Sequence, residues 1–330
     1  MKAAYIEEIG SPDKIIYGEL PTPVPTAREV LVKVGAVSLN PVDTYIRSGL
    51  VQMDLPLPFV VGCDLAGVVE EVAPGATYFR KGDRVWGTNQ GLLGRQGTFS
   101  EYAAVDECWL YPTPPDVSDE TAAAVSLVGI TAHLGLVRDA RLKASELIFV
   151  HGGTGGVGAM VVQMAKALGA RVITTGGSDE KIAACRQLGA DLALNYKTED
   201  VDDAIRQFVP EGVNVFWETL REPDFDRIVS LLANRGRIVL MAGREARPEF
   251  PVGPFYIKGC SMHGFAMFAT TAEEQRRAAA DINRWLIEGK LTARIDRVMP
   301  FSEAAAAHRL QEENTLHYAG TLAGKIVLVP

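Results

Sequence analysis

The pattern of hydrophobic and polar positions changes near residue 123 of the chain. Before that point, short apolar or alternating runs are separated by prolines, which predicts antiparallel strands in a compact, barrel-like domain. These strands include residues 29–37, 67–72 and 99–105. After that point, short apolar runs alternate with helical stretches, and this alternation is typical of a doubly wound parallel sheet.

The second region predicts six strands with helices between them. The strands are expected at residues 147–150, 171–175, 191–195, 213–217, 237–241 and 259–264. The helices are expected at residues 159–168, 179–188 (with Ser178 as N-cap), 201–208 and 225–232.

The last part of the chain adds elements that a six-stranded nucleotide domain does not need. They are a helix at 272–287, a strand at 294–299, a helix at 302–310 and a strand at 325–329. We expect them to return to the first domain. The predicted α/β organisation is therefore a discontinuous domain of residues 1–122 and 266–330 and a continuous domain of residues 123–265.

A glycine cluster directly follows the first strand of the second region. Gly153, Gly155 and Gly158 satisfy G-x-G-x-x-G between a predicted strand and a predicted helix, which is the context that this motif requires. The first glycine forms the turn, the second lets a pyrophosphate approach the backbone, and the third lets helix and strand pack closely. The alternative is a glycine-rich turn without a ligand. We predict a dinucleotide site that includes Gly153, Thr154, Gly155, Gly156, Val157 and Gly158.

Composition and charge limit the class of protein. A chain of 330 residues exceeds a typical single core, and 47% hydrophobic with 22% charged residues indicates a globular protein. The formal net charge of −8 argues against nucleic acid or an anionic membrane as the main partner.

The cysteines and the apolar segments indicate a cytoplasmic protein. Cys63, Cys108, Cys185 and Cys260 are scattered without a C-x-x-C pair, as in proteins with reduced thiols. Acidic residues precede any N-terminal hydrophobic segment, so no signal peptide is predicted. The most apolar stretch, Ala122–Val137, is interrupted by polar residues and looks too short to span a bilayer.

Four motifs carry a family resemblance. They are Asn40–Gly49 (NPVDTYIRSG), Gly62–Gly67 (GCDLAG), Lys81–Val85 (KGDRV) and His151–Gly158 (HGGTGGVG). In order and spacing they make the chain similar, over nearly its whole length, to zinc-independent medium-chain dehydrogenases/reductases of the quinone oxidoreductase (zeta-crystallin-like) group. The resemblance implies a GroES-like catalytic domain completed by the C-terminal segment, a Rossmann domain, and a cofactor cleft between them.

The resemblance also bears on zinc. Zinc-dependent relatives carry cysteine where Asn40 stands, G-H-E where Gly62-Cys63-Asp64 stands, and a second cysteine near Leu127. Their structural zinc lobe has four closely spaced cysteines, and none occurs between Trp86 and Cys108. Because catalytic zinc needs three protein ligands and only Cys63 and Asp64 remain, we predict no metal.

The cofactor is predicted to be NADPH in preference to NADH. The second strand ends in Thr174-Thr175-Gly176-Gly177-Ser178, without the carboxylate that binds a ribose 2′-hydroxyl. Ser178 and Lys181 would suit a 2′-phosphate, and the family places a lysine and a tyrosine at the positions of Lys181 and Tyr196. Asp179 and Glu180 lower the local positive potential, and a solvated helix face is the other reading of Lys181.

Further cofactor contacts and the catalytic groups are predicted from the same comparison. Tyr45 is the candidate proton donor, and Asn40 would position the nicotinamide ribose or the substrate carbonyl. The alternatives are a packed ring and an Asn-Pro turn. Asp43 is expected to be a helix cap or a partner of Arg47. The remaining predicted cofactor contacts are Thr131, Gly177, Thr219, Ala242, Gly243 and Phe265.

Three arginines follow strands of the second domain where relatives differ. Arg221, Arg244 and Arg247 lie on loops at the expected ligand-binding edge. They would recognise an acidic or carbonyl substrate, or form surface ion pairs with Glu218, Glu222 or Glu245. Phe265 and Phe268 would line the nicotinamide pocket, or belong to the core or a dimer interface.

Together these features predict a zinc-free, NADPH-dependent oxidoreductase that reduces quinones or related conjugated carbonyls. The alternative on the same scaffold is an enone, enal or enoyl-thioester (alkenal) reductase. An alternative of another class is a non-enzymatic NADPH-binding structural or RNA-associated protein, which the acidic charge disfavours. The sixth strand is expected at an exposed sheet edge, and pairing with a second copy would cover it, so we predict a homodimer.

Overall fold

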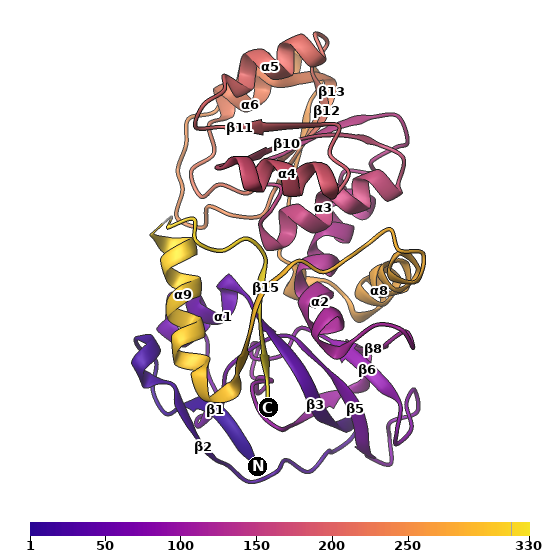
Figure 1. Cartoon of the computed structure of the whole chain (residues 1–330), viewed down its shortest axis with the longest axis vertical. Helices are drawn as coiled ribbons and strands as arrows, with labels where there is room; N and C mark the ends of the chain where they lie inside the picture. Colours follow the sequence, from indigo (N-terminus) through magenta and orange to yellow (C-terminus); the bar gives the residue numbers. More distant parts are fainter. Residues whose placement is uncertain (318) are drawn as a thin grey trace. The chain divides into compact units, whose positions relative to one another are not determined.

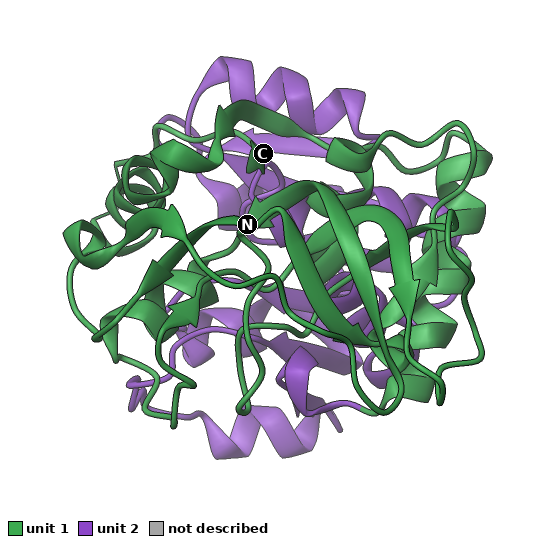
Figure 2. Ribbon diagram, turned by 90° about the horizontal axis from the view of Figure 1, so that it is seen from below, with its two compact units in different colours: residues 1–128, 271–330 green, residues 129–270 purple. Residues whose placement is uncertain are grey.

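The computed structural model describes residues 1–317 and 319–330, which form two units coloured separately in Figure 2. Unit 1 comprises residues 1–128 and 271–330, and unit 2 comprises residues 129–270. The divisions therefore fall after Val128 and Thr270, whereas the sequence places them after residues 122 and 265.

Unit 1 is built around the long strand β3 (Glu29–Leu39). β3 pairs antiparallel with β5, β7 and β16, and the sheet continues in the order β15-β16-β3-β5-β6-β8. A second, three-stranded sheet has the order β2-β1-β4. The strands are β1 (Lys2–Ile6), β2 (Ile16–Glu19), β4 (Phe59–Val60), β5 (Leu65–Val72), β6 (Arg84–Gly87), β7 (Tyr102–Asp106), β8 (Leu110–Pro112), β15 (Ile295–Pro300) and β16 (Lys325–Val329).

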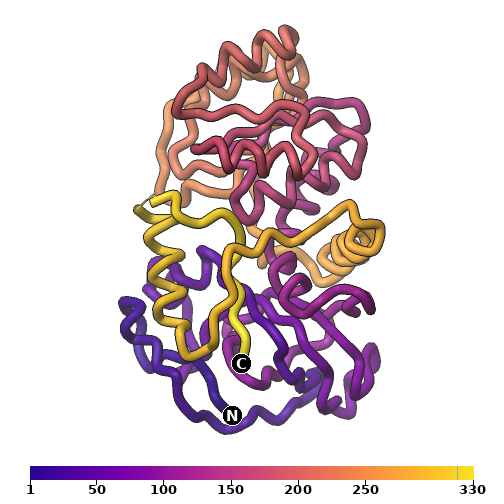
Figure 3. The backbone as a smooth tube through the Cα atoms, viewed as in Figure 1, coloured from indigo at the N-terminus to yellow at the C-terminus, as the bar shows by residue number. Residues whose placement is uncertain are grey.

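The C-terminal segment belongs to unit 1 through direct strand pairing. Figures 1 and 3 show the yellow end of the chain beside the indigo strand β3, where Ile326 pairs with Leu39. β16 lies between β15 and β3 in the sheet, and its apolar residues Ile326–Leu328 are fully buried.

Unit 1 also contains three α-helices that matter below. They are α1 (Pro41–Ser48), α8 (Ala272–Ile287) and α9 (Ala304–Leu316). The sequence does not predict α1, because Asn40-Pro41 also suits a turn; proline is tolerated in the first turn of a helix, and Gly49 at φ +81° ends it. The predicted helix 302–310 is too short, since α9 continues to Leu316.

The longest apolar helix extends beyond the stretch that the sequence marks. α2 (Asp119–His133) continues into a π-helical turn, η3 (Leu134–Asp139), to give 21 residues. By length and composition this helix could cross a membrane, so the expectation that it is too short is wrong. In the protein, 78% of its apolar window is buried, as in the core helix of a globular protein.

Unit 2 contains a six-stranded sheet in the order β11-β10-β9-β12-β13-β14, with every pair parallel. This is the doubly wound order, and the predicted fold class is confirmed. The strands are β9 (Leu147–Val150), β10 (Arg171–Gly176), β11 (Leu192–Asn195), β12 (Val213–Glu218), β13 (Leu232–Leu240) and β14 (Ser261–Gly264). The helices are α3 (Gly156–Ala167), α4 (Asp179–Gln187), α5 (Val201–Phe208), α6 (Phe225–Leu231) and α7 (Val252–Ile257).

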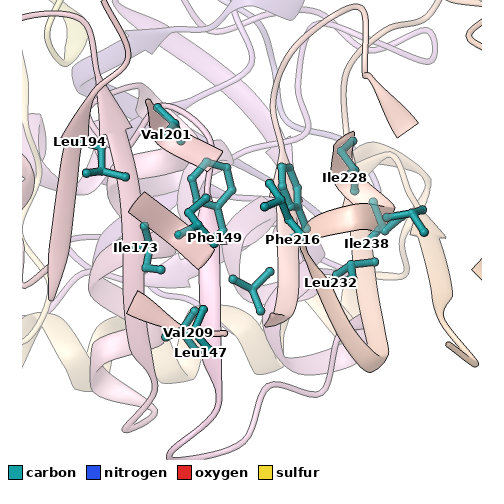
Figure 4. Packing of buried hydrophobic residues seen from close by; sticks show 14 of the residues in the cluster. Leu147, Phe149, Ile173, Leu194, Val201, Val209, Phe216, Ile228, Leu232 and Ile238 are labelled. Carbon is teal, nitrogen blue, oxygen red and sulfur yellow. The ribbon is translucent and has the colours of Figure 1, made fainter. Parts of the chain in front are cut away.

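The core of unit 2 explains why these strands read as continuous apolar runs. Phe149 of β9 and Phe216 of β12 face one another with ring centroids 4.7 Å apart, as Figure 4 shows. Ile173, Leu194 and Ile238 complete this side of the sheet. Ile148 and Val150 alternate with Phe149 and are also fully buried, so both faces of β9 are covered. Each such side chain contributes about 1.5–3 kcal/mol by leaving water.

Candidate functional site

The glycine turn follows β9 and leads into α3, as its sequence predicts. A Cβ atom at Gly153 would lie 2.3 Å from Oγ1 of Thr174, and one at Gly158 would lie 2.1 Å from the carbonyl oxygen of Gly152. Neither approach is possible for a real Cβ atom. The packing of the protein itself therefore requires glycine at these two positions.

Gly155 has a different reason to be glycine. Its φ is −68°, which any residue adopts, and a Cβ atom there would meet nothing closer than the Gly152 oxygen at 3.6 Å. Neither backbone conformation nor packing of the protein excludes a side chain. The open space beside Gly155 is where the sequence predicts that a dinucleotide pyrophosphate approaches the backbone.

The N-terminus of α3 suits the same group. Gly155 is the N-cap and makes no side-chain cap hydrogen bond. The first N–H groups of a helix have no partners within it, and they carry the positive end of the helix dipole. A phosphate bound there would satisfy them.

Four predicted contacts lie together after β10 and β11. A Cβ atom at Gly177 would lie 2.4 Å from the hydroxyl of Tyr196, so these residues touch. Ser178 is the N-cap of α4, as predicted, and its Oγ accepts the Lys181 N–H at 3.3 Å. Asp179, which weakens the case for a 2′-phosphate, accepts a hydrogen bond from Nδ2 of Asn195 at 3.2 Å.

The loop after β12 is fastened to the start of the glycine turn. Oγ1 of Thr219 donates to the carbonyl oxygen of His151 at 2.9 Å, and Nδ1 of His151 lies 3.1 Å from Oε1 of Glu218. The Glu218 carboxylate is 2% exposed and also accepts the Leu220 N–H at 2.7 Å. The sequence does not predict this His151–Glu218 pair, which holds two loops at the carboxyl edge of the sheet.

The next loop carries Ala242 and Gly243. Gly243 has φ +84°, and a Cβ atom on it would lie 2.5 Å from the carbonyl oxygen of Arg221. Of the arginines, Arg244 is exposed and lies 4.0 Å from Glu245, which is one of the surface pairs that the sequence suggests. Nη1 of Arg247 donates to the carbonyl oxygen of Ala246 at 2.8 Å.

Thr131 and Phe265 also belong to unit 2. Thr131 is buried on α2. The Phe265 ring lies against the π-helical turn. The Arg138 guanidinium is 5.3 Å from the ring centroid, and a Cβ atom at Gly135 would lie 3.1 Å from Cε1 of the ring. The predicted contacts of unit 2 thus follow the carboxyl ends of its parallel strands, except Thr131.

Asn40 and Tyr45 lie in unit 1, at the start and in the middle of α1. The Asn40 side chain is fully buried: Nδ2 donates to Oδ2 of Asp64 at 2.8 Å, and Oδ1 accepts from Nζ of Lys325. Tyr45 is half-buried. The proposed contacts of both residues with cofactor or substrate stay predictions.

Asp43 caps α1 locally, and Arg47 has another partner. Oδ2 of Asp43 accepts the Asn40 N–H at 2.7 Å. Arg47, at the other end of the helix, donates to the Gly10 carbonyl oxygen and to Oε1 of Glu312. The helix-cap alternative for Asp43 therefore describes the structure, and the Asp43–Arg47 pair does not.

Burial dominates the electrostatics around Asn40. It raises the pKa of Asp43 to about 7, and the nearby Asp64 charge adds to this effect, while the Cys63 thiol and the Asn40 N–H oppose it. Burial likewise raises the pKa of Asp64 and of Cys63, and lowers the pKa of Lys325.

These residues do not suit a zinc ion. A tetrahedral zinc site needs three converging N, S or O ligands. Here Asp64 and Asn40 are hydrogen-bonded to each other, and Nζ of Lys325 donates to Oδ1 of Asn40 in the same cluster. Within residues 1–317 and 319–330, no group of three or more His, Cys, Asp or Glu side chains could hold a metal ion.

Family models match both halves of the chain. Residues 26–115 match the alcohol dehydrogenase GroES-like domain, and residues 156–283 match the zinc-binding dehydrogenase domain. The quinone oxidoreductases of Sus scrofa and Homo sapiens are each 33% identical to the chain, over all of it and 98% of their own length. An NADPH-dependent alkenal/one oxidoreductase of Arabidopsis thaliana is 31% identical over all of this chain and 80% of its own length.

Solved structures show the same likeness. The Escherichia coli quinone oxidoreductase complexed with NADPH superposes with a TM-score of 0.85 at 26% identity, and the match covers 100% of both chains. An alcohol dehydrogenase superfamily protein from Novosphingobium aromaticivorans superposes with a TM-score of 0.88 at 28% identity, again over 100% of both chains.

Proposed function

The chain belongs to the quinone oxidoreductase group of the medium-chain dehydrogenase/reductase family, and from this premise we propose that it is an NADPH-dependent, zinc-free reductase of quinones or related conjugated carbonyls. The observation that carries the cofactor assignment is Gly155, where the protein leaves room for a side chain and has none. The E. coli quinone oxidoreductase, a structural neighbour, is bound to NADPH.

Unit 2 would hold the nucleotide. The amides at the start of α3 bind the pyrophosphate, and Gly155 lets it approach. Ser178, Lys181 and Tyr196 receive the 2′-phosphate, since they lie together after β10 and β11, where the Asp179 carboxylate is already bonded to Asn195. When bound, the reduced nicotinamide supplies the hydride.

Unit 1 would supply the polar groups for the acceptor. Reduction of a quinone adds a hydride and a proton, and Tyr45 delivers or relays that proton to the acceptor oxygen. Both N–H groups of the Asn40 carboxamide are used within the protein, by Asp64 and by the Ser38 carbonyl oxygen. Its Oδ1 accepts from Lys325 and keeps one lone pair, so Asn40 suits a hydroxyl donor such as a ribose better than a carbonyl.

A second substrate class follows from the relatives. The Arabidopsis thaliana relative acts on alkenals and alkenones, and it matches the whole of this chain. Hydride delivery to the β-carbon of an enone leaves an enolate; a proton on its oxygen gives an enol, which tautomerises to the saturated carbonyl, so the groups in unit 1 serve both reactions. The acceptor therefore has to be found by assay.

The first experiment ranks acceptors with the purified protein. NADPH oxidation is followed at 340 nm with 1,2-naphthoquinone, an alkenal and crotonyl-CoA, before and after extensive chelation. We expect the quinone to give the largest kcat/KM and chelation to leave it unchanged. Turnover that requires stoichiometric zinc would overturn the metal-free assignment, and turnover with the alkenal alone would move the protein to the second class.

The second experiment tests the nucleotide site itself. Gly155→Val adds a side chain where the protein has space and the pyrophosphate should lie. We expect an unchanged melting temperature and at least about a hundredfold weaker NADPH binding by calorimetry, since the phosphate contacts are lost. Gly253→Ala, at a helical glycine with nothing within 4 Å, is the matched control and should bind normally. Equal binding by both variants would contradict the site.

We also infer that the protein is a homodimer formed through β14. This strand is the last of its sheet and pairs only with β13 within the described residues. Beside it, Val252, Tyr256 and Ile257 of α7 are 63–75% exposed, and Met262 of β14 is 40% exposed. A second copy paired edge to edge would cover both the strand and the apolar side chains. Ile257→Glu should lower the mass seen by sedimentation to that of one chain; an unchanged dimer would place the interface elsewhere.

A further inference from the structure

A buried cluster in unit 1 joins three segments that are far apart in the sequence. Lys325 opens β16, Asn40 ends β3 and begins α1, and Asp64 precedes β5. Nζ of Lys325 donates to the Leu39 carbonyl oxygen at 2.8 Å and to Oδ1 of Asn40, while Nδ2 of Asn40 donates to Oδ2 of Asp64 at 2.8 Å. We call Lys325, Asn40 and Asp64 the Asn40 clamp.

The clamp fixes the orientation of one carboxamide. Its oxygen accepts from the Lys325 amino group and its nitrogen donates to the Asp64 carboxylate. Turning the carboxamide over would place two donors together at one end and two acceptors at the other. Oγ of Ser38 also donates to Oδ2 of Asp64 at 2.9 Å, and Ser38, Asn40 and Asp64 are fully buried. Between fully buried groups, such charge-assisted hydrogen bonds are strong, and breaking one leaves a buried charge unpaired.

The orientation of Asn40 is passed on to α1. The Asn40 N–H donates to Oδ2 of Asp43, and the Asp43 N–H donates to the Asn40 carbonyl oxygen at 3.1 Å, so the first turn of the helix is built on Asn40. The far end is held by Arg47 and Glu312. α1 has only eight residues, and a helix of that length does not hold its own geometry without such anchors.

We propose that Lys325 and Asp64 are positioning residues: they set the Asn40 carboxamide and the start of the helix that carries Tyr45, and through them the rate of proton delivery. This rests on the proposed function, in which Asn40 and Tyr45 meet the reactants. It also assigns a role to the C-terminal strand, because β16 brings the only cation that the described structure places on the Asn40 oxygen.

The test uses Lys325→Met, Asp64→Asn and the double variant in the full chain. The matched control is Glu107→Gln, which removes another buried carboxylate of unit 1, paired with Arg28 and bonded to the Thr77 and Tyr78 N–H groups. Per folded molecule, Lys325→Met should lower kcat at least about tenfold, because small displacements of reacting groups are costly. NADPH affinity should fall less than kcat does, because the phosphate contacts in unit 2 remain, and the control should keep its kcat.

The double variant separates positioning from stability. Lys325→Met leaves the Asp64 charge unpaired, whereas the double variant removes both charges and should regain most of the lost melting temperature. Its kcat should stay low, since the Asn40 carboxamide still lacks its charged partners. Recovery of kcat together with the melting temperature would overturn the proposal, and so would a wild-type kcat in Lys325→Met.

Hydrogen exchange supplies a readout that needs no substrate. Backbone amides of residues 42–48 should exchange at least about tenfold faster in Lys325→Met and in the double variant, and at the wild-type rate in Glu107→Gln. Unchanged exchange over these residues would refute the clamp. If the wild-type protein turned over none of the three acceptor classes, the proposed function would fail, and the exchange result would still decide whether Lys325 and Asp64 hold the helix.

Discussion

The glycine turn of unit 2 and the start of α1 in unit 1 are built in opposite ways. The turn depends on glycines: at Gly153 and Gly158 a Cβ atom would collide with the Thr174 side chain and the Gly152 carbonyl oxygen, and at Gly155 there is open space. The start of α1 is held by buried polar and charged side chains that directly follow β3, directly precede β5 and open β16. The comparison teaches that the shape of a turn can rest on local chain geometry, whereas the position of α1 depends on side chains that are far apart in the sequence.

The largest expected effect comes from breaking the far anchor of α1. Glu312→Gln removes the charged partner of Arg47, whose side chain is 1% exposed, and should cost about 3 kcal/mol in the free energy of unfolding by urea. Arg309 lies on α9, as Glu312 does, and forms an exposed pair with Asp13. Asp13→Asn breaks this pair and should lower the free energy of unfolding by less than about 0.5 kcal/mol. Similar losses for the two variants would show that burial does not govern this anchor.

Breaking the glycine turn should cost somewhat less. In Gly158→Ala the new methyl group meets the Gly152 carbonyl oxygen, and the strain of moving the turn should lower the free energy of unfolding by about 1–3 kcal/mol. NADPH binding should weaken as well, because the amides of α3 shift with the turn. A variant with the wild-type free energy of unfolding would mean that the turn can shift without strain. The close packing of Gly158 would then not distinguish this turn from the start of α1.

The nucleotide preference sharpens the comparison on the side of unit 2. Ser178→Asp keeps an N-cap on α4 but places a carboxylate where the 2′-phosphate should lie. The ratio of NADPH to NADH affinity, measured by calorimetry, should fall at least about tenfold. The reverse exchange of cap residue, Asp200→Ser at the start of α5, is the control and should leave the ratio unchanged.

The smallest effect concerns acid stability near α9 in unit 1. Burial lowers the pKa of His308 from 6.5 to about 3, and the Arg47 charge adds to this. The unfolded chain therefore takes up a proton first, and the stability that neutral His308 contributes above pH 6.5 is lost as pH falls toward 3. Between pH 6 and pH 5 this loss is about 1 kcal/mol, which His308→Leu should abolish in urea unfolding. Parallel curves for both proteins would show that another group carries the acid sensitivity.

The sequence predicts the parts whose causes are local. The alternation of strands and helices predicts the parallel sheet of unit 2, and the spacing of Gly153, Gly155 and Gly158 predicts the turn, because these constraints act within about a dozen consecutive residues. Ser178 as the N-cap of α4 is confirmed for the same reason: one side chain bonds to a backbone three residues away.

The sequence does not predict what distant segments build together. Asn40-Pro41 reads equally well as a turn or as the start of α1, and only the Asn40 clamp decides between them. In the sequence, Lys325 is a single charged residue at the start of an apolar strand. That position alone does not predict that its side chain is buried beside Asn40. The length of the helix formed by α2 and η3 is also underestimated, because the polar residues at its two ends are helical and the apolar run covers only its middle.

The interruption of unit 1 by unit 2 has a consequence for how the protein forms on the ribosome. Unit 2 is one uninterrupted stretch and can close as soon as it has emerged. The first 128 residues lack the strand that pairs with β3, and Asn40 lacks its bond to Lys325, until β16 has been synthesised. During that interval the N-terminal half would be the segment that chaperones protect.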